Sequence, residues 1–169
     1  MAASNVARLP ASVVDATLAA ELEAAGAWAK RLNIPFEWDA RTRQLRVTLE
    51  QPETGELFYL GGQFDDYRLL PPSWRWYSAD WSVADRPNLS PNNANARFGS
   101  SQFISQSGRA VICAAYNRLA HKCYGGPHSD WGDPINWATA GGNHIRATTI
   151  GDMLQAIRRD LLTSRGRLQ

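Results

Sequence analysis

The chain has 169 residues, a length that favours a single domain, and 44% of them are hydrophobic while 20% are charged. This composition is typical of a globular protein and excludes a disordered chain. The formal net charge of +2 is too small to indicate a broad nucleic-acid-binding surface, so no nucleic-acid partner is expected. No run of about 18 apolar residues occurs, and Met1–Pro10 lacks the features of a secretion signal. We therefore expect a cytoplasmic protein with no membrane partner.

The first half of the chain predicts a helix followed by a sheet. Apolar residues recur at spacings of three and four from about Ser12 to Leu32, which indicates an amphipathic helix with Ser12 and Asp15 as a capping box. Four short apolar runs bounded by turn residues then predict strands, at Phe36–Trp38, Leu45–Leu49, Leu57–Leu60 and Trp74–Trp76. Gly61 and Gly62 are expected to end the third strand. The order predicts an antiparallel meander with a helix on one face, an α+β fold.

The second half is less regular. Residues 78–106 are polar, small and rich in Asn, Ser and Pro, and we expect a functional loop or insertion there. Ala110–Ala115 is an apolar run that contains Cys113, and Tyr124–His144 is again loop-like. A last helix is predicted from about Thr149 to Thr163, with Thr149 and Asp152 as its start signal. Residues 1–169 thus form one domain, with its core at about 12–162.

Several local motifs follow this order of elements. They are Tyr67 with Pro71-Pro72 and the alternating Trp74 and Trp76, then Arg86-Pro87-Asn88, Gly108 with Ile112-Cys113, and Trp137 ahead of Thr149–Ile157. The ordered set resembles the ubiquitin-conjugating enzyme family, whose last strand follows a Tyr and a Pro-Pro pair and whose catalytic Cys follows a His-Pro-Asn triplet. Here Arg86 replaces the His, and 24 residues separate Asn88 from Cys113, where the family has only a handful.

The resemblance is to the bacterial ubiquitin-conjugating-like proteins, several of whose operons are similar to antiphage defence systems. It implies an acyltransferase that accepts a ubiquitin-like protein on Cys113 from an activating enzyme and transfers it to a target protein. Asn88 would stabilise the oxyanion. No cofactor is implied, because the activating enzyme uses the ATP. The activating enzyme would dock on the solvent face of the first helix, which includes Glu21, Glu23, Lys30 and Arg31.

The residues themselves leave two readings of Cys113 open. A thiolate is nucleophilic enough to accept an acyl group from another thioester, and the small Ala114 and Ala115 leave space beside it. A cysteine within an apolar run is also a common core residue. In that case the domain would be a catalytically inactive binding scaffold.

Other candidate site residues also have alternatives. His128 and Asp130 are the candidate general bases, unless their loop is only a turn-rich segment with Trp131 packed on the core. Asn88 is either the oxyanion partner or a turn residue after Pro87, and Ser105 or Gln106 could take its role instead.

Metal binding is the weaker alternative. Five possible ligands lie close together in sequence, but they include no Cys-x-x-Cys or His-x-x-x-His pair: Cys113, His121, Cys123, His128 and His144. We expect no metal site, and a zinc-binding defence protein of another fold is the remaining alternative. Of the seven tryptophans, three fall in loops that could line a groove around Cys113: Trp81, Trp131 and Trp137.

Overall fold

The computed structural model describes residues 9–92, 101–139 and 147–168. Its helices are α1 (Ala11–Arg31), α2 (Ser101–Ser107) and α3 (Ile150–Leu162), and its strands are β1 (Phe36–Asp39), β2 (Gln44–Gln51), β3 (Glu56–Gln63) and β4 (Ser73–Tyr77). Short 3-10 turns are η1 (Pro87–Leu89), η2 (Arg118–Ala120), η3 (Lys122–Tyr124) and η4 (Pro134–Asn136). The strands pair antiparallel in the order β1-β2-β3-β4, as predicted.

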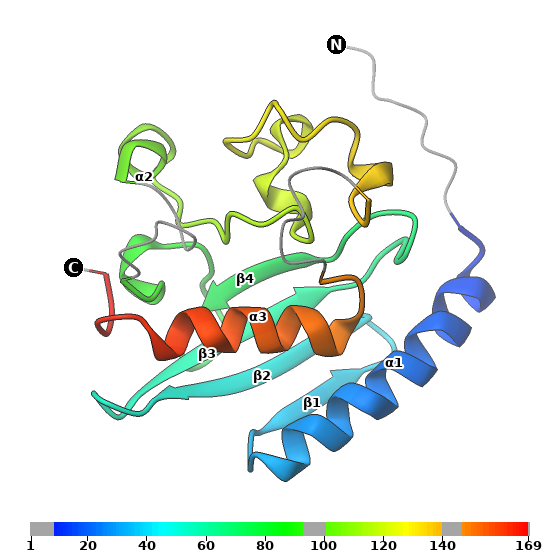
Figure 1. Ribbon diagram of the computed structural model, residues 1–169, viewed down its shortest axis with the longest axis horizontal. Coiled ribbons are helices and arrows are strands. Elements are labelled where there is room, and N and C mark those ends of the chain that lie inside the picture. Colours follow the sequence, from blue (N-terminus) through cyan, green and yellow to red (C-terminus); the bar gives the residue numbers. More distant parts are fainter. Residues whose placement is uncertain (1–8, 93–100, 140–146, 169) are drawn as a thin grey trace.

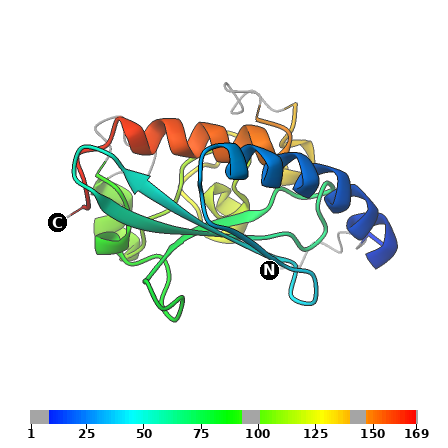
Figure 2. The same cartoon turned by 90° about the horizontal axis from the view of Figure 1, so that it is seen from below.

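Two helices cover one face of the sheet (Figure 1 and Figure 2). Strand alternation in β2 places Leu45, Val47 and Leu49 under these helices, where all three are buried. The apolar stripes of α1 and α3 pack against this layer, and Trp74 and Trp76 of β4 complete it. The predicted α+β architecture of helix, meander and helix is therefore confirmed.

The two helix starts differ. The predicted capping box of Ser12 and Asp15 is wrong, because Pro10 precedes the first turn without a side-chain cap and Asp15 instead pairs with Arg43 at 3.0 Å. At α3 the predicted box is present: Asp152 N–H donates to Thr149 Oγ1, and Thr149 N–H donates to the Asp152 carboxylate, each at 3.2 Å.

The Gly61-Gly62 pair lies inside β3 rather than at its end. A Cβ atom on Gly61 would overlap the ring of Tyr77, and one on Gly62 would lie 2.6 Å from the ring of Trp74. The glycines therefore make room for the large aromatic side chains of the neighbouring strand β4. They mark a close approach of side chain to backbone, not a turn.

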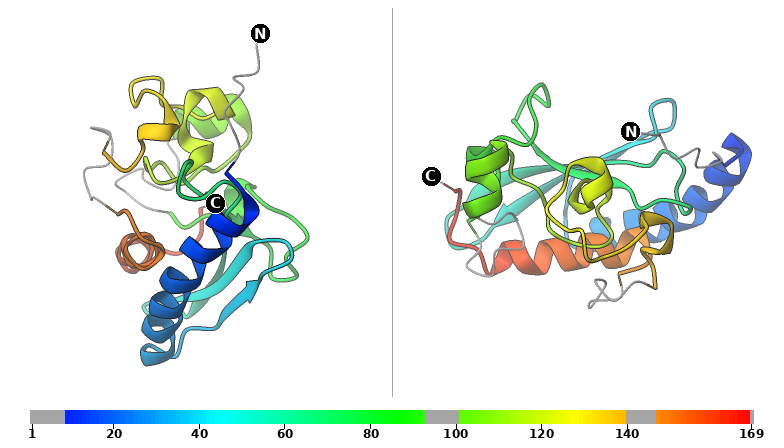
Figure 3. Two further views of the ribbon diagram at one scale, coloured as in Figure 1. Left: turned by 90° about the vertical axis from the view of Figure 1, so that its right-hand side faces the viewer. Right: turned by 90° about the horizontal axis from the view of Figure 1, so that it is seen from above.

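The irregular part of the chain lies beside the outer edge of β4 (Figure 3). Backbone bonds join it to that edge, because Asp85 N–H donates to Trp76 O at 3.0 Å and Arg118 N–H donates to Pro72 O at 2.9 Å. Within the described residues, no helix is long and apolar enough to cross a membrane.

Candidate functional site

Cys113 is the partly exposed member of a buried segment. Its neighbours Ile112 and Ala114 are buried in the main core, while Cys113 is half-buried and its thiol donates to Val111 O at 3.5 Å. The backbone around Cys113 is thus fixed by core packing, yet the residue itself is not fully buried. Such exposure is what a reactive thiol requires.

Asn117 holds this segment against β4. Its side chain is fully buried, and its Oδ1 accepts from the N–H groups of Trp74 at 2.9 Å and Leu119 at 3.3 Å. Its Nδ2 donates to Trp74 O at 3.3 Å and to Ile112 O at 2.9 Å. One amide therefore replaces the missing neighbour of an edge strand and fixes the carbonyl just before Cys113. The sequence analysis missed Asn117, although a lone amide in an apolar run is itself a signal, since a buried amide needs partners.

His121 holds the other side of Cys113. The imidazole is buried, and its Nε2 lies 2.9 Å from Ala115 O, so this nitrogen carries the hydrogen. Its ring packs edge-on against Trp131. The carbonyls of Ile112 and Ala115, on either side of Cys113, are therefore each bound by a buried side chain.

Asp85 fixes the start of the segment. Its buried carboxylate pairs with Arg75 and, at 3.3 Å, with Arg109. Its backbone donates to Trp76 O at 3.0 Å and accepts from Ala110 N–H at 2.8 Å. Burial raises the pKa of the Asp85 carboxyl, and the two guanidinium groups oppose that rise.

The structure brings His128 and Asp130 together. His128 Nδ1 lies 3.5 Å from the Asp130 carboxylate, and the imidazole stacks on Trp131 with ring centroids 3.7 Å apart. Burial lowers the pKa of His128, and Asp130 opposes that shift, so the ring is neutral near pH 7, as a general base must be. Trp131 in turn packs against a small buried cluster of Val111, Leu119 and Ala120, and Val111 stands two residues before Cys113.

Asn88 lies in η1, which contacts the C-terminal segment. It is exposed in η1, and its side chain makes no hydrogen bond within the described residues. Arg167 donates to Leu89 O at 3.3 Å and so ties this turn to the C-terminal segment. Ser105 and Gln106 are exposed on α2. The assignment of an oxyanion residue stays a prediction for all three.

The loop tryptophans lie in different places. Trp137 is buried and donates its Nε1–H to Arg68 O at 3.2 Å, so it belongs to the core and not to a groove. Trp81 packs against Tyr59 and Tyr77 on the sheet face opposite the helices. Trp131 is the one of the three that packs beside the Cys113 segment.

No group of three or more His, Cys, Asp or Glu side chains in the described residues is arranged to hold a metal ion. His121 binds a carbonyl instead, and Cys123 is exposed. His144 lies outside the described residues.

The expected docking face on α1 needs one correction. Glu21 does not face solvent, because its carboxylate accepts from Tyr67 Oη–H at 2.7 Å and from Ile150 N–H at 2.9 Å and pairs with Arg68 at 2.9 Å. It joins α1 to the first turn of α3. The other three residues of that face are exposed: Glu23, Lys30 and Arg31.

Comparison of the chain with known protein-family models, with curated proteins and with solved structures gives no match in any of the three.

Proposed function

We propose that this chain is a ubiquitin-like-protein conjugating enzyme that carries its cargo as a thioester on Cys113. The observation that carries the proposal is the partly exposed thiol between Ile112 and Ala115, whose carbonyls are bound by buried Asn117 and His121. A thioester carrier needs a sulfur that a flexible C-terminal tail can reach and a backbone that does not move away from it. The order of helix, meander and helix agrees with the resemblance in sequence.

The reaction has two acyl-transfer steps. In the first, the Cys113 thiolate attacks the carbonyl carbon of the thioester on the activating enzyme, and the enzyme's thiolate leaves. In the second, an amine or hydroxyl of the target attacks the new thioester, the Cys113 thiolate leaves, and a base takes the proton of the nucleophile. The neutral His128 beside Asp130 supports this last role.

The biological setting proposed from the resemblance is bacterial antiphage defence in the cytoplasm. The partners would be a ubiquitin-like protein, its activating enzyme and a target protein. The chain itself would need no cofactor, since ATP is consumed in forming the first thioester.

A charging assay tests the proposal. The full chain is mixed with ATP and with a ubiquitin-like protein and activating enzyme of the kind that such operons encode, and is resolved on non-reducing gels. We expect a band shift that a thiol reductant removes and that Cys113→Ala abolishes. Cys113→Ser should give an ester that resists the reductant, and Cys123→Ser, the matched control, should charge normally. Absence of a shift with partners shown to be active would overturn the proposal.

A non-catalytic scaffold of the same fold is the second candidate function. The observation that favours it is the exposed Asn88, which has no hydrogen bond to the described residues. This candidate predicts that wild type and Cys113→Ala bind the ubiquitin-like protein equally and that neither is charged. The charging assay separates the two candidates, and titration calorimetry of both proteins checks that they bind the ubiquitin-like protein equally.

A further inference from the structure

A hollow of about 430 Å³ lies where the end of α1, the β2–β3 hairpin and α3 meet. It shares no residue with the Cys113 segment. Its lining is mainly apolar, with one cation and one carboxylate, and the residues used below are Leu32, Ile34, Leu57, Leu162, Arg158 and Glu50. This surface is distinct from the proposed thioester site.

Exposed leucines gather at this hollow. Leu32 is 42% exposed and Leu57 is 43% exposed, and the described residues contain five exposed large hydrophobic residues, the least exposed at 37%. Two of the five therefore line one hollow, although they come from elements far apart in sequence. Single exposed apolar residues are ordinary, whereas a gathered set marks an interaction site.

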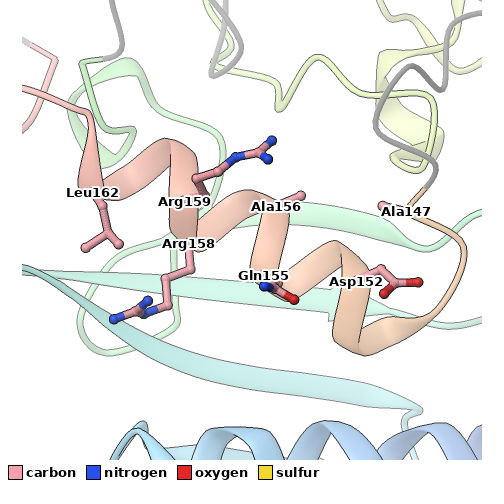
Figure 4. Close-up of a pocket in the computed structure, with 7 residues that line it drawn as sticks. All are labelled: Ala147, Asp152, Gln155, Ala156, Arg158, Arg159 and Leu162. Atoms are coloured by element: carbon pink, nitrogen blue, oxygen red, sulfur yellow. The ribbon is translucent and has the colours of Figure 1, made fainter.

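Helix α3 contributes a cation to the hollow. Arg158 lines it and forms no ion pair within the described part of the chain, and the exposed Lys30 and Arg31 directly precede Leu32. A second hollow of about 370 Å³ lies along the same helix, and Arg158 lines both hollows. Figure 4 shows Arg158 and Arg159 projecting to opposite sides of α3. On the other side, the hairpin contributes Glu50.

We propose that this hollow binds a short segment of a protein partner in which an aliphatic residue stands next to an acidic one. The aliphatic side chain would lie between Leu32 and Leu57, and the neighbouring carboxylate would pair with the guanidinium of Arg158. Arginine donates two parallel hydrogen bonds to a carboxylate, which gives this contact a fixed direction. The basic end of α1 favours an acidic partner over a basic one.

A random peptide display library, selected on the full chain, tests this inference independently of charging. We expect enriched peptides that place Leu, Ile or Val beside Asp or Glu. A synthetic copy of an enriched peptide should lose about tenfold or more in affinity on Arg158→Glu, because a charge-assisted contact is replaced by repulsion. Leu57→Asp should also weaken it. Arg41→Glu, an equal charge change in the β1–β2 turn, should leave the affinity unchanged.

Three results would overturn the inference. They are a library that yields no enriched peptide, enriched peptides that are basic, and binding that survives both Arg158→Glu and Leu57→Asp. Sedimentation analysis of the wild type and Leu57→Asp adds one more outcome. Self-association that Leu57→Asp abolishes would identify a second copy of this chain as the occupant. Both variants alter exposed or partly exposed side chains, and circular dichroism verifies that they fold.

Discussion

The sheet and the irregular segment beside it bury their backbone polar groups in different ways. In the sheet, strand ladders pair these groups, and apolar side chains then pack between β2 and the helices. Beyond the edge of β4, scattered backbone bonds share this work with individual side chains, since Asn117 pairs the backbone of Trp74 and His121 binds Ala115 O. Figure 3 shows these two regions from two sides.

This difference determines how each region should fail. Removal of one large side chain from an apolar core leaves a cavity, and because a small domain unfolds cooperatively, the whole domain loses stability. A polar clamp has only a few directed bonds, so its loss frees one local segment. Both kinds of structure meet at Cys113, because Ile112 and Ala114 pack in the core while Asn117 and His121 bind the carbonyls of Ile112 and Ala115.

The largest effect is expected in the core of the sheet. Trp76 is fully buried and packs edge-on against Phe58, with ring centroids 5.9 Å apart. Trp76→Ala should lower the free energy of unfolding by about 3–5 kcal/mol, much of the stability of an ordinary domain. Urea unfolding followed by circular dichroism measures this. Trp81→Ala, on the other face of the sheet, should lower the free energy of unfolding clearly less. An equal loss in the two variants would contradict the larger role given to the core between the sheet and the helices.

The clamp should show the local kind of failure. Asn117→Ala leaves four buried backbone groups without their partner and should lower the free energy of unfolding by about 2–4 kcal/mol. Alkylation of Cys113 by iodoacetamide should accelerate several-fold, while that of the exposed Cys123 stays unchanged, as peptide mass spectrometry can follow. Equal acceleration at both thiols would show global loosening and would refute a local clamp.

The same contrast explains what could be predicted from the sequence. Helices α1 and α3 and strand β2 follow periods of 3.6 and 2, which need only neighbouring residues, and their existence was predicted correctly. The short helix α2 lies largely within residues 78–106, where a loop was expected. Asn117 acts on Trp74, 43 residues away, and Glu21 acts on Ile150, 129 residues away. No local pattern carries such pairings, so Glu21 was wrongly expected on a solvent face.

The residues of the candidate site likewise include some that a local pattern predicts and some that only long-range contacts place. Cys113 stood out because one thiol in an apolar run with small neighbours is a local pattern, and His128 and Asp130 are only two residues apart. The clamp of Asn117 and His121 depends on contacts made by folding. The place of Asn88 depends on the C-terminal segment, which is distant in sequence.

Glu21 offers an intermediate case, a polar hub inside the regular half. Its carboxylate bonds to Tyr67 and Ile150, and burial with this neighbouring carboxylate holds the pKa of Tyr67 above its usual range, so the phenol remains a donor. Glu21→Ala should lower the free energy of unfolding by about 2 kcal/mol, as expected for the loss of hydrogen bonds to a charged group. Glu23→Ala, an exposed matched control on α1, should cost less than about 0.5 kcal/mol. Thermal unfolding of the two variants in parallel measures the difference.

The smallest effect concerns the pH response of the irregular half. Because burial lowers the pKa of His128 below its ordinary value of about 6.5, the unfolded chain binds this proton more readily than the folded chain. His128 therefore lowers the free energy of unfolding as the pH falls through its ordinary pKa, until the folded group also titrates. His128→Phe keeps a ring on Trp131 and should remove this contribution.

Urea titrations at about pH 7.5 and about pH 5.5 compare the two proteins. The wild type should lose more stability on acidification than His128→Phe, and parallel losses would show that His128 does not titrate as its burial requires. Asp130→Asn provides the sharper control. Since the Asp130 carboxylate opposes the lowering of this pKa, its removal should lower the pKa of His128 further and enlarge the acid loss. A smaller loss in Asp130→Asn would mean that the two side chains, 3.5 Å apart, are not coupled in solution.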